Sequence, residues 1–356
     1  MSRTKKKTTL LYFIVATFCF SLLAGTALAA APKTMRVAGI FSMNVPQVEG
    51  VERPFFNSFT EKSGFDIKVT YNPSDVVNVQ AADALRTLRA GTFDIMSVQI
   101  GMASKDDPFL EGIDLVGVST NMQDLRSAAD AYREVFDQRL QQRFNVKALA
   151  IWPFGPQVFF FNKPITGISD FKGLKIRSFT PSMAALIQHF GGTPVTMGFP
   201  DVYTALQRGV VDAGCTAPAA GNGANWPEVT SHQYPLAVSG SMQGHFVNLN
   251  YWNRFSKEDQ DKIQAMFKKM EDDLWEVANR VNGNALLCNT GSPECVEMNK
   301  FAMTLVPVSP EDTAKVNAAV SEVVLPMWKE TCNKIYPECT AVWNDTVGKA
   351  RGFTIQ

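Results

Sequence analysis

The chain has 356 residues, with 34 basic and 34 acidic side chains, so its formal net charge at pH 7 is zero. Four of the basic residues lie within the first seven positions, and the chain without residues 1–29 carries 30 basic and 34 acidic side chains, a net charge of −4. A mildly acidic protein without a basic block is a poor candidate for binding nucleic acid or an anionic membrane.

The N-terminus has the pattern of a secretory leader. After Arg3 and three lysines, an apolar run extends over 10–23 and is followed by Ala27-Leu-Ala29, the small-x-small pattern that signal peptidase cleaves. A transmembrane anchor is the alternative, but the run is short for a bilayer span. Cys19 has no small residue before it, which argues against a lipoprotein anchor. We therefore predict a signal peptide over 1–29 and a periplasmic protein.

The first half of the mature chain alternates between strand-like and helix-like segments. Short apolar or alternating runs indicate strands, and apolar residues recurring at steps of three and four indicate helices. The loop over 42–50, after the first strand, is expected to face a ligand cleft. Strands are predicted over 35–41, 65–71, 93–98 and 146–151, and helices over 55–62, 75–90 and 127–144.

Two later segments predict that the chain crosses between two lobes. Trp152-Pro-Phe-Gly-Pro156 is a strong break, after which a strand over 158–161 begins the second lobe. A strand over 245–251 is expected to return to the first lobe. Ser256-Lys-Glu-Asp259 then resembles a capping box, and it opens a helix of about thirty residues, about 45 Å long at 1.5 Å per residue. A coiled coil needs a longer heptad pattern, so we expect this helix to lie across both lobes.

The length of the chain also favours two lobes. About 325 residues after the leader exceed what one hydrophobic core usually holds. The segments 88–94 and 206–212 carry leucine, glycine and aspartate at the same offsets, which supports two lobes of similar plan. The predicted fold is α/β, with the first lobe over 33–156 and 241–284. The second lobe covers 157–240 and 285–356 and includes the C-terminal helices.

Five cysteines remain after the leader, and four of them form two pairs, each seven residues apart. Disulfides are typical of exported proteins, whereas zinc sites usually have spacings of two to four residues. We favour the disulfides Cys288–Cys295 and Cys332–Cys339, although four cysteines allow three connectivities. Cys215 is then expected to be a small buried residue without a partner.

The most informative stretch begins with Asp170-Phe-Lys-Gly-Leu-Lys-Ile-Arg177, a strand that ends in a cation. Ligands of open α/β sheets bind beyond the carboxyl ends of the strands. The planar guanidinium of Arg177 suits a carboxylate, which it can contact with two parallel hydrogen bonds. The alternative is an ordinary surface arginine after an edge strand.

Two further motifs follow in order, Gly192-Thr-Pro-Val195 and Tyr203-Thr-Ala-Leu-Gln-Arg-Gly-Val-Val-Asp212. With the first motif, they make the chain resemble the solute receptors of TRAP transporters, the periplasmic dicarboxylate-binding-protein family, from about Met35 onward. The resemblance implies a two-lobed, type II-like periplasmic binding protein without enzymatic activity or cofactor. Such a receptor closes on a small organic acid and delivers it to integral-membrane subunits.

The resemblance also assigns expected ligand contacts. Arg177 matches the principal carboxylate-binding arginine of the family, and Phe199 matches an aromatic residue that packs on the ligand. Gln99 lies where the first lobe usually contributes a polar contact. Thr216 falls where many relatives have the asparagine of a Glu-Asn-Pro element, but this chain has Cys215-Thr-Ala-Pro218 there, which puts that contact in doubt.

A departure from the family at Gln157 predicts the ligand class. Many relatives place a second arginine there, so a glutamine removes a fixed positive charge from the pocket. Burying a second carboxylate without its own cation would cost on the order of several kcal/mol. We therefore expect a monocarboxylate with an apolar, aromatic or 2-oxo body, unless Arg126 or a metal ion enters the site.

Aromatic residues near these positions are candidates for the apolar walls of the pocket. Phe154 and Trp226 are expected to contact the ligand, and Trp152 and Phe179 are further candidates. Each has the alternative of an ordinary core position, since aromatic side chains mostly serve burial.

Catalysis has little support in the sequence. The three histidines, His189, His232 and His245, lack metal-ligand spacing, and neither a Gly-x-Ser-x-Gly elbow nor a phosphate loop occurs. A secreted hydrolase is thus the weakest reading. A receptor of an ABC-type or sensory system remains the main alternative, although no sensory module is evident.

Overall fold

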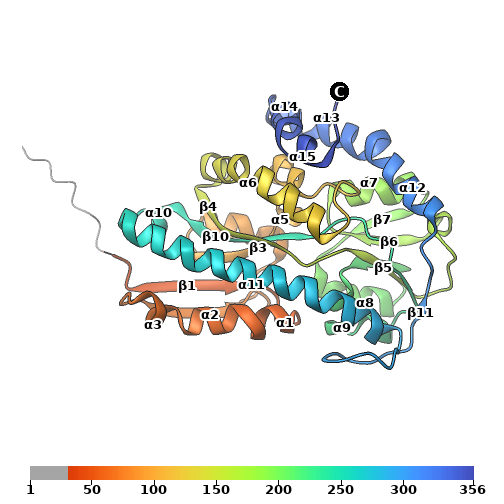
Figure 1. Ribbon diagram of the computed structural model, residues 1–356, viewed down its shortest axis with the longest axis horizontal. Helices are drawn as coiled ribbons and strands as arrows, with labels where there is room; N and C mark the ends of the chain where they lie inside the picture. Colours follow the sequence, from red (N-terminus) through yellow and green to blue (C-terminus); the bar gives the residue numbers. More distant parts are fainter. Residues whose placement is uncertain (1–30) are drawn as a thin grey trace, which may run out of the picture.

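A computed structural model describes residues 31–356, and the predicted signal peptide lies outside these residues. The described chain forms two lobes, each built on one mixed sheet, and one long helix runs along both (Figure 1). Within residues 31–356 no helix has both the length and the apolar character that a membrane crossing requires.

The first lobe contains a five-stranded sheet in the order β2-β1-β3-β10-β4. Strands β1, β2 and β3 are parallel, whereas β10 is antiparallel to both of its neighbours, β3 and β4. The strand predicted to return from the second lobe is therefore inserted into this sheet. The strands are β1 Thr34–Gly39, β2 Lys68–Pro73, β3 Ile95–Gln99, β4 Val146–Pro153 and β10 Met242–Asn248.

The second lobe contains a six-stranded sheet in the order β11-β9-β5-β8-β6-β7. Strands β6, β7 and β8 are parallel, and β5 is antiparallel to β8 and β9. In each lobe the first of the three parallel strands, β1 or β6, lies between the other two. The strand that enters from the other lobe, β10 or β5, lies beside the third parallel strand, β3 or β8. The strands are β5 Val158–Phe161, β6 Lys175–Ser178, β7 Thr193–Thr196, β8 Ala213–Thr216, β9 His232–Tyr234 and β11 Thr304–Leu305.

Helices cover the faces of both sheets (Figure 1). In the first lobe they are α1 Val45–Gln47, α2 Arg53–Asn57, α3 Phe59–Ser63, α4 Ala84–Arg89, α5 Ile100–Ala103, α6 Met122–Phe144 and α10 Leu249–Trp252. In the second lobe they are α7 Pro181–His189, α8 Val202–Gln207 and α9 Pro218–Gly223. The remaining helices are α11 Lys257–Asn289, α12 Pro310–Ala319, α13 Leu325–Ile335, α14 Cys339–Trp343 and α15 Lys349–Arg351.

The helix predicted over 75–90 is only half formed. Regular α-helix begins at Ala84, after turns and a short 3₁₀ segment. The turns form because long-range hydrogen bonds hold this segment: the Asp75 carboxylate accepts from the backbone N–H of Ser42 at 2.8 Å, and the Ser74 hydroxyl donates to the carbonyl of Gly39. Asn78 also has a positive φ of 57°. These contacts tie the segment to the end of β1.

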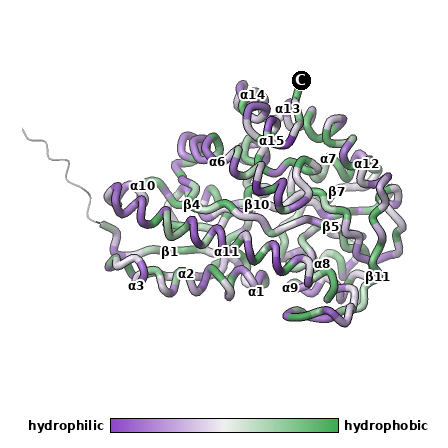
Figure 2. Tube along the Cα trace, in the orientation of Figure 1, coloured by the Kyte–Doolittle hydropathy of each residue, from purple (hydrophilic) through white to green (hydrophobic). Residues whose placement is uncertain are grey.

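The long helix α11 begins where the capping pattern predicts and spans both lobes. The Ser256 hydroxyl accepts from the backbone N–H of Asp259 at 3.1 Å, and the helix runs for 33 residues. It packs on β4 in the first lobe and on α9 in the second. Figure 2 shows polar and apolar residues alternating along it, because only one side faces the protein.

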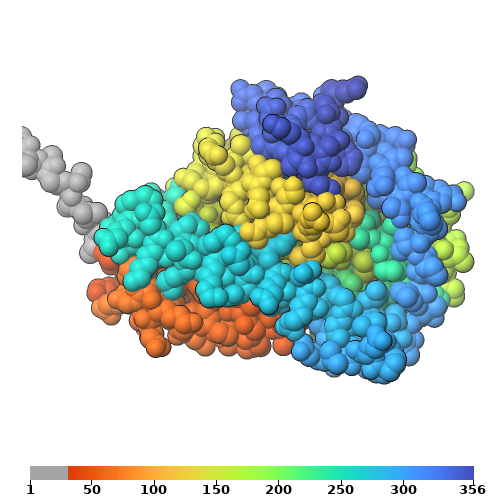
Figure 3. All heavy atoms as spheres, viewed as in Figure 1, coloured from red at the N-terminus to blue at the C-terminus, as the bar shows by residue number. Residues whose placement is uncertain are grey.

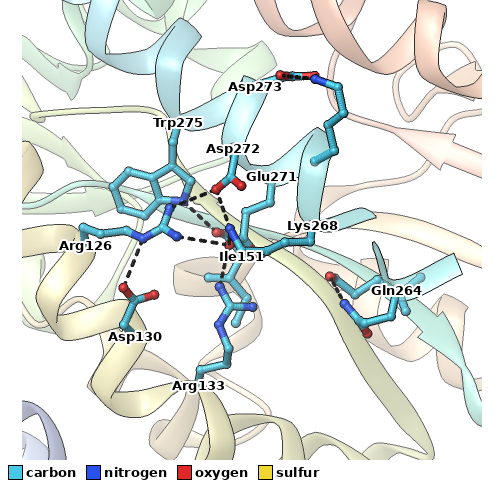
Figure 4. Close-up of polar contacts among 12 residues, drawn as sticks. Arg126, Asp130, Arg133, Ile151, Gln264, Lys268, Glu271, Asp272, Asp273 and Trp275 are labelled. Atoms are coloured by element: carbon cyan, nitrogen blue, oxygen red, sulfur yellow. Dashed lines mark hydrogen bonds and ion pairs between the residues drawn. The ribbon is translucent and has the colours of Figure 1, made fainter. Parts of the chain in front are cut away.

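Side chains of α11 cover the free edge of β4, the outer strand of the first sheet (Figure 4). The Gln264 amide donates to the Leu149 carbonyl at 2.8 Å, and the Glu271 carboxylate accepts from the Ile151 N–H at 2.7 Å. The Trp275 indole donates to the Ile151 carbonyl at 2.9 Å. An uncovered strand edge is a template for pairing with another chain, so α11 protects this edge while it joins the lobes.

The C-terminal helices pack on both lobes and not on the second lobe alone, as was predicted. Trp328 and Trp343 are fully buried, and their indole N–H groups donate to the carbonyls of Pro108 and Gly112, both at 2.8 Å. These carbonyls belong to a 3₁₀ segment of the first lobe, Pro108–Ile113. Helices α14 and α15 therefore lie on the first lobe, as Figure 3 shows for the dark-blue segment, whereas α12 contacts α7 of the second lobe and α13 contacts both lobes.

Two disulfides are present, with the pairings that the spacing favoured. Cys288 at the end of α11 is joined to Cys295, and Cys332 of α13 is joined to Cys339 of α14. Cys215 is buried in β8 and has no disulfide partner among residues 31–356. The two short loops stiffen the connection after α11 and the α13–α14 corner.

Candidate functional site

A narrow cavity lies between the lobes, at the carboxyl ends of β3, β6 and β8, with about 20 Å³ of space for the centres of water-sized spheres. Both lobes and the first crossing segment contribute side chains to its wall. It is lined by Phe41, Asn44, Gln99, Phe154, Gln157, Arg177, Phe179, Phe199, Thr216, Ala220, Ser241 and Gln243. This is the position at which open α/β sheets bind ligands.

Arg177 is the cation of the cavity, and it is 1% exposed. One terminal nitrogen donates to the Cys215 carbonyl at 2.7 Å, and Nε donates to the Met197 carbonyl at 3.3 Å. The guanidinium also stacks on the ring of Phe179, 4.7 Å from its centroid. The second terminal nitrogen, Nη2, has no hydrogen-bond partner among the described residues. Carbonyls thus orient the guanidinium and leave one nitrogen free.

The charge of Arg177 is not balanced inside the cavity. Burial lowers the pKa of Arg177 to about 10, because the charged form loses its hydration. The residues that line the cavity include no aspartate or glutamate. A buried cation without a counter-ion is costly, so the cavity favours a ligand that brings a negative charge.

The neutral side chain of Gln157, which the sequence predicts in place of a second cation, lies inside the cavity. Gln157 is 2% exposed, and its amide donates to the carbonyl of Gly155 at 2.9 Å. Arg126 does not line the cavity: it pairs with Asp130 at 3.1 Å and stacks over Trp275 (Figure 4). Arg126 therefore adds no charge to this site.

Gln99 and Thr216 both lie where the sequence places them, at the ends of β3 and β8. The Gln99 amide donates to the hydroxyl of Ser241 at 3.4 Å. Thr216 is 4% exposed, so its side chain is enclosed by the wall of the cavity. The two strands bring these polar groups to the cavity from opposite lobes.

Four phenylalanines line the cavity, Phe154 and Phe199 among them, but the two candidate tryptophans do not. Trp226 is fully buried behind Phe199, with 5.4 Å between ring centroids, so it supports the wall from outside. It fits there because residue 214 is glycine: a Cβ at that position would lie 2.6 Å from the Trp226 ring. Trp152 packs in the first-lobe core.

Sequence reasoning missed several cavity residues. Ser241 directly precedes β10 and Gln243 is its second residue; the strand begins earlier than predicted because it pairs with both β3 and β4. Gln243 lies directly opposite Gln99 in this register. Phe41 and Asn44 follow β1, near and within the loop predicted to face the cleft. Recognising that β10 inserts antiparallel beside β3 would have identified Gln243, because this pairing places it opposite Gln99.

A carboxylate of the first lobe, which the sequence did not reveal, faces the second crossing segment. Asp114 accepts from the backbone N–H of Gly240 at 3.0 and 3.1 Å, and burial raises its pKa to about 7, although hydrogen bonds from Gly240, Ser241 and Met242 oppose this. Phe154 N–H donates to the Ser241 carbonyl at 3.2 Å, so the two crossings pair with each other. Asp114 therefore holds the connection between the lobes.

Known proteins share both the sequence pattern and the fold. The chain is 30% identical over 229 residues to the sialic acid-binding periplasmic protein SiaP of Vibrio cholerae, covering 61% of this chain and 68% of that protein. A TRAP periplasmic solute-binding protein of Desulfovibrio salexigens with bound orotic acid superimposes with a TM-score of 0.78 at 16% identity, over 89% of this chain and 99% of that chain. A TRAP periplasmic solute-binding protein of Shewanella oneidensis with bound succinate gives 0.75 at 17% identity, over 90% and 100%.

The family match covers most of the chain. Residues 37–331 match the family described as bacterial extracellular solute-binding protein, family 7. The match includes the second sheet, the first sheet except for the start of β1, the cavity residues and the whole of α11. The chain belongs to this family, and it is a solute-binding receptor of the TRAP transporter type.

Proposed function

We propose that this protein is the periplasmic receptor of a TRAP transporter for an organic monocarboxylate with an apolar body. The observation that carries the proposal is Arg177, a fully enclosed guanidinium with one free nitrogen in a cavity without acidic residues. A carboxylate is the ligand group that such a fork binds best, through charge-assisted hydrogen bonds. The carboxylate would also supply the missing counter-charge.

The choice of a monocarboxylate rests on this chain's own cavity. SiaP is named for sialic acid, and the two structures hold orotic acid and succinate, so the fold accepts acids with one or two carboxylates. Here Arg177 is the only lysine, arginine or histidine in the wall, and Gln157 is neutral. A second carboxylate would be buried without a cation, at a cost of several kcal/mol by order of magnitude.

The choice of an apolar body rests on the phenylalanines. Four phenylalanines face one small cavity: Phe41, Phe154, Phe179 and Phe199. Each Å² of apolar ligand surface that they bury stabilises the complex by about 25 cal/mol. Enclosure of the ligand by both lobes would stabilise the closed state, because only that state contacts the ligand from both sides. The wall contains no histidine, cysteine, lysine or carboxylate to act as a general base, which supports binding rather than catalysis.

The proposal also includes export and a membrane partner. A signal peptide over 1–29 would deliver the receptor to the periplasm. There the closed receptor would dock on the integral-membrane subunits and release its acid to them. A receptor of an ABC-type system has no observation of its own in its favour.

Arg177→Ala tests the carboxylate site. Calorimetry on the acid identified by mass spectrometry of co-purified ligand should show affinity reduced by roughly a hundredfold or more. Lysine should rescue binding only partly, because an ammonium lacks the planar fork. Arg126→Ala is the control, since this arginine lies outside the cavity, and it should leave affinity unchanged. Near-wild-type binding by Arg177→Ala would disprove the assignment.

The ligand class is tested by a thermal-shift screen. An acid present at 100 times its dissociation constant should stabilise the receptor by about 2.7 kcal/mol. Aryl and branched monocarboxylates, and 2-oxo acids, should raise the melting temperature more than succinate, fumarate or malate. The reverse order would show that the second carboxylate finds a partner and that the monocarboxylate proposal is wrong.

A further inference from the structure

The cavity adjoins a second chamber inside the first lobe. This side chamber shares three wall residues with the main cavity, Phe41, Gln99 and Gln243, and its space of about 10 Å³ for the centres of water-sized spheres suits a single small polar group. Its wall also includes the hydroxyl-bearing Ser97 and Ser74. A ligand body that extends away from Arg177 therefore meets polar side chains of the first lobe.

Three of these side chains lie on one face of the first sheet. Gln99 of β3 and Gln243 of β10 are direct partners in the antiparallel register, so their side chains are neighbours on the same face. Ser97 precedes Gln99 by two residues along β3 and therefore lies on that face as well. The sheet thus presents one hydroxyl and two amides as a continuous polar strip.

Two atoms of this strip lack hydrogen-bond partners. The hydroxyl oxygen of Ser97 and Oε1 of Gln243 are buried without a partner among residues 31–356, and the two residues are 6% and 0% exposed. The Gln243 amide nitrogen has only a long contact of 3.5 Å to the Ser241 carbonyl. Buried polar atoms in native proteins nearly always have a partner. Ser97 and Gln243 are therefore poised to bond something that enters the chamber.

We propose that Ser97, Gln99 and Gln243 form a subsite for a neutral hydrogen-bond donor, an O–H or N–H group, on the body of the bound acid. The inference rests on the proposed function, because Arg177 must hold the carboxylate at the other end. The free oxygen of Gln243 accepts and does not donate, so it would oppose a second carboxylate. A charged amine would find no carboxylate in either wall.

The test compares acids that differ in one donor. Two pairs of probes serve: 4-hydroxybenzoate with benzoate, and pyroglutamate with 5-oxotetrahydrofuran-2-carboxylate, in which a ring oxygen replaces the N–H. Calorimetry on the wild type should show that the donor-bearing acid of at least one pair binds about tenfold more tightly, the factor that one net hydrogen bond confers. Gln243→Leu and Ser97→Ala should each reduce that preference to less than about threefold, with the affinity for the plain acid retained.

A matched control lies in the same chamber. The Ser74 hydroxyl already donates to the Gly39 carbonyl, so Ser74→Ala should keep the preference for the donor-bearing acid. Ser97→Ala removes a single oxygen and serves if Gln243→Leu fails to fold. Equal affinity of the wild type within both pairs overturns the subsite, as does a preference that survives both substitutions, or a lack of binding by all four acids.

The two proposals fail in different ways. If the paired acids bind equally but Arg177→Ala abolishes their binding, the donor subsite is wrong and the carboxylate site stands. If the preference depends on Gln243 while Arg177→Ala has no effect, the ligand is held by the first lobe alone. In that case the proposed carboxylate site is wrong.

Discussion

The two lobes share one plan down to the register of their central strands. Gly91 and Gly209 end α4 and α8 at positive φ values of 76° and 67°. Three residues later, Asp94 accepts from the backbone N–H of Arg36 at 2.7 Å, and Asp212 accepts from that of Lys175 at 2.9 Å. The repeated leucine, glycine and aspartate pattern therefore marks the same structural step in each lobe: the third strand is tied to the first.

This register makes Arg177 the counterpart of Ala38. Val37 pairs with Ile95 and Ala38 with Met96 in the first lobe, as Ile176 pairs with Ala213 and Arg177 with Gly214 in the second. Ala38 and Arg177 are both almost completely buried. Under the proposed function, this one side chain at a shared position decides which lobe would hold the anion, and the other lobe would provide neutral contacts.

The lobes also differ in how they treat buried charge. In the first lobe, the fully buried Glu271 pairs with Arg133 at 2.7 Å and the buried Glu52 contacts His245 at 2.7 Å. In the second lobe, the buried Arg177 has no acidic partner among the described residues. Charge in the first lobe serves the fold, and the charge of Arg177 is available to a ligand. Substitutions should separate these two uses.

The largest effect is expected from Glu271→Ala. The substitution leaves the Ile151 N–H and the partly exposed Arg133 guanidinium without their acceptor, and removing the buried partner of such a pair costs about 3 to 5 kcal/mol. Urea denaturation should therefore show a clear loss of stability. Asp273→Ala is the control on the same helix: its ion pair with Lys269 is exposed (Figure 4) and should contribute less than about 0.5 kcal/mol. Equal effects would show that Glu271 does not hold α11 on β4.

The second effect concerns Asp114. Its carboxylate forms no ion pair among the described residues and accepts hydrogen bonds from backbone N–H groups. Its pKa is raised to about 7 in the folded protein, against about 3.9 in an unfolded chain. The folded state therefore binds this proton more tightly. Stability from this group is fully present below about pH 4 and is lost as the pH rises to about 7, by up to about 4 kcal/mol.

Asp114→Asn should remove this slope, because asparagine does not titrate. Between about pH 4 and pH 7, the unfolding free energy of the wild type should fall steadily relative to that of the variant. Above about pH 7 the difference should stay constant. Glu111, another buried acid whose pKa burial raises, is present in both proteins and cancels in the difference. A flat difference would contradict the shift.

The smallest effect is expected from Arg177→Met in the ligand-free protein. Methionine removes an uncompensated buried charge and retains most of the volume, so stability should stay level or rise by about 1 kcal/mol, while binding is lost. Urea denaturation with and without ligand measures both. A loss of more than about 1 kcal/mol without ligand would mean that Arg177 holds the second lobe together as Glu271 holds the first.

The sequence predicted those features that depend on local pattern. Arg177 follows from a strand that ends in a motif, and α11 follows from its spacing and its cap at Ser256. Gln157, Gln99 and Phe199 lie next to strand ends or breaks, so their place in the cavity could be inferred. The two cysteine pairs were recognisable because the partners lie only seven residues apart.

The features that sequence reasoning missed depend on partners far along the chain. Gln243 enters the site because β10 pairs with β3, whose sequence lies more than a hundred residues earlier. Trp328 joins the first lobe through Pro108, 220 residues away. Tryptophan is a residue type that often contacts ligands, but the packing of Trp226 over Gly214 places it behind the cavity wall. Residue type alone does not say which side of a wall a side chain occupies.

The attachment of α11 to both lobes has a mechanical consequence. Beyond Glu271, Asn282 donates to the Phe154 carbonyl at 2.8 Å and accepts from the Ala219 N–H at 3.2 Å, and Asn289 accepts from Asn222 at 2.7 Å. A rod fastened at both ends cannot slide, so separation of the lobes must flex α11 or detach its asparagines. Long helices bend gently, so α11 would resist separation of the lobes as a spring does.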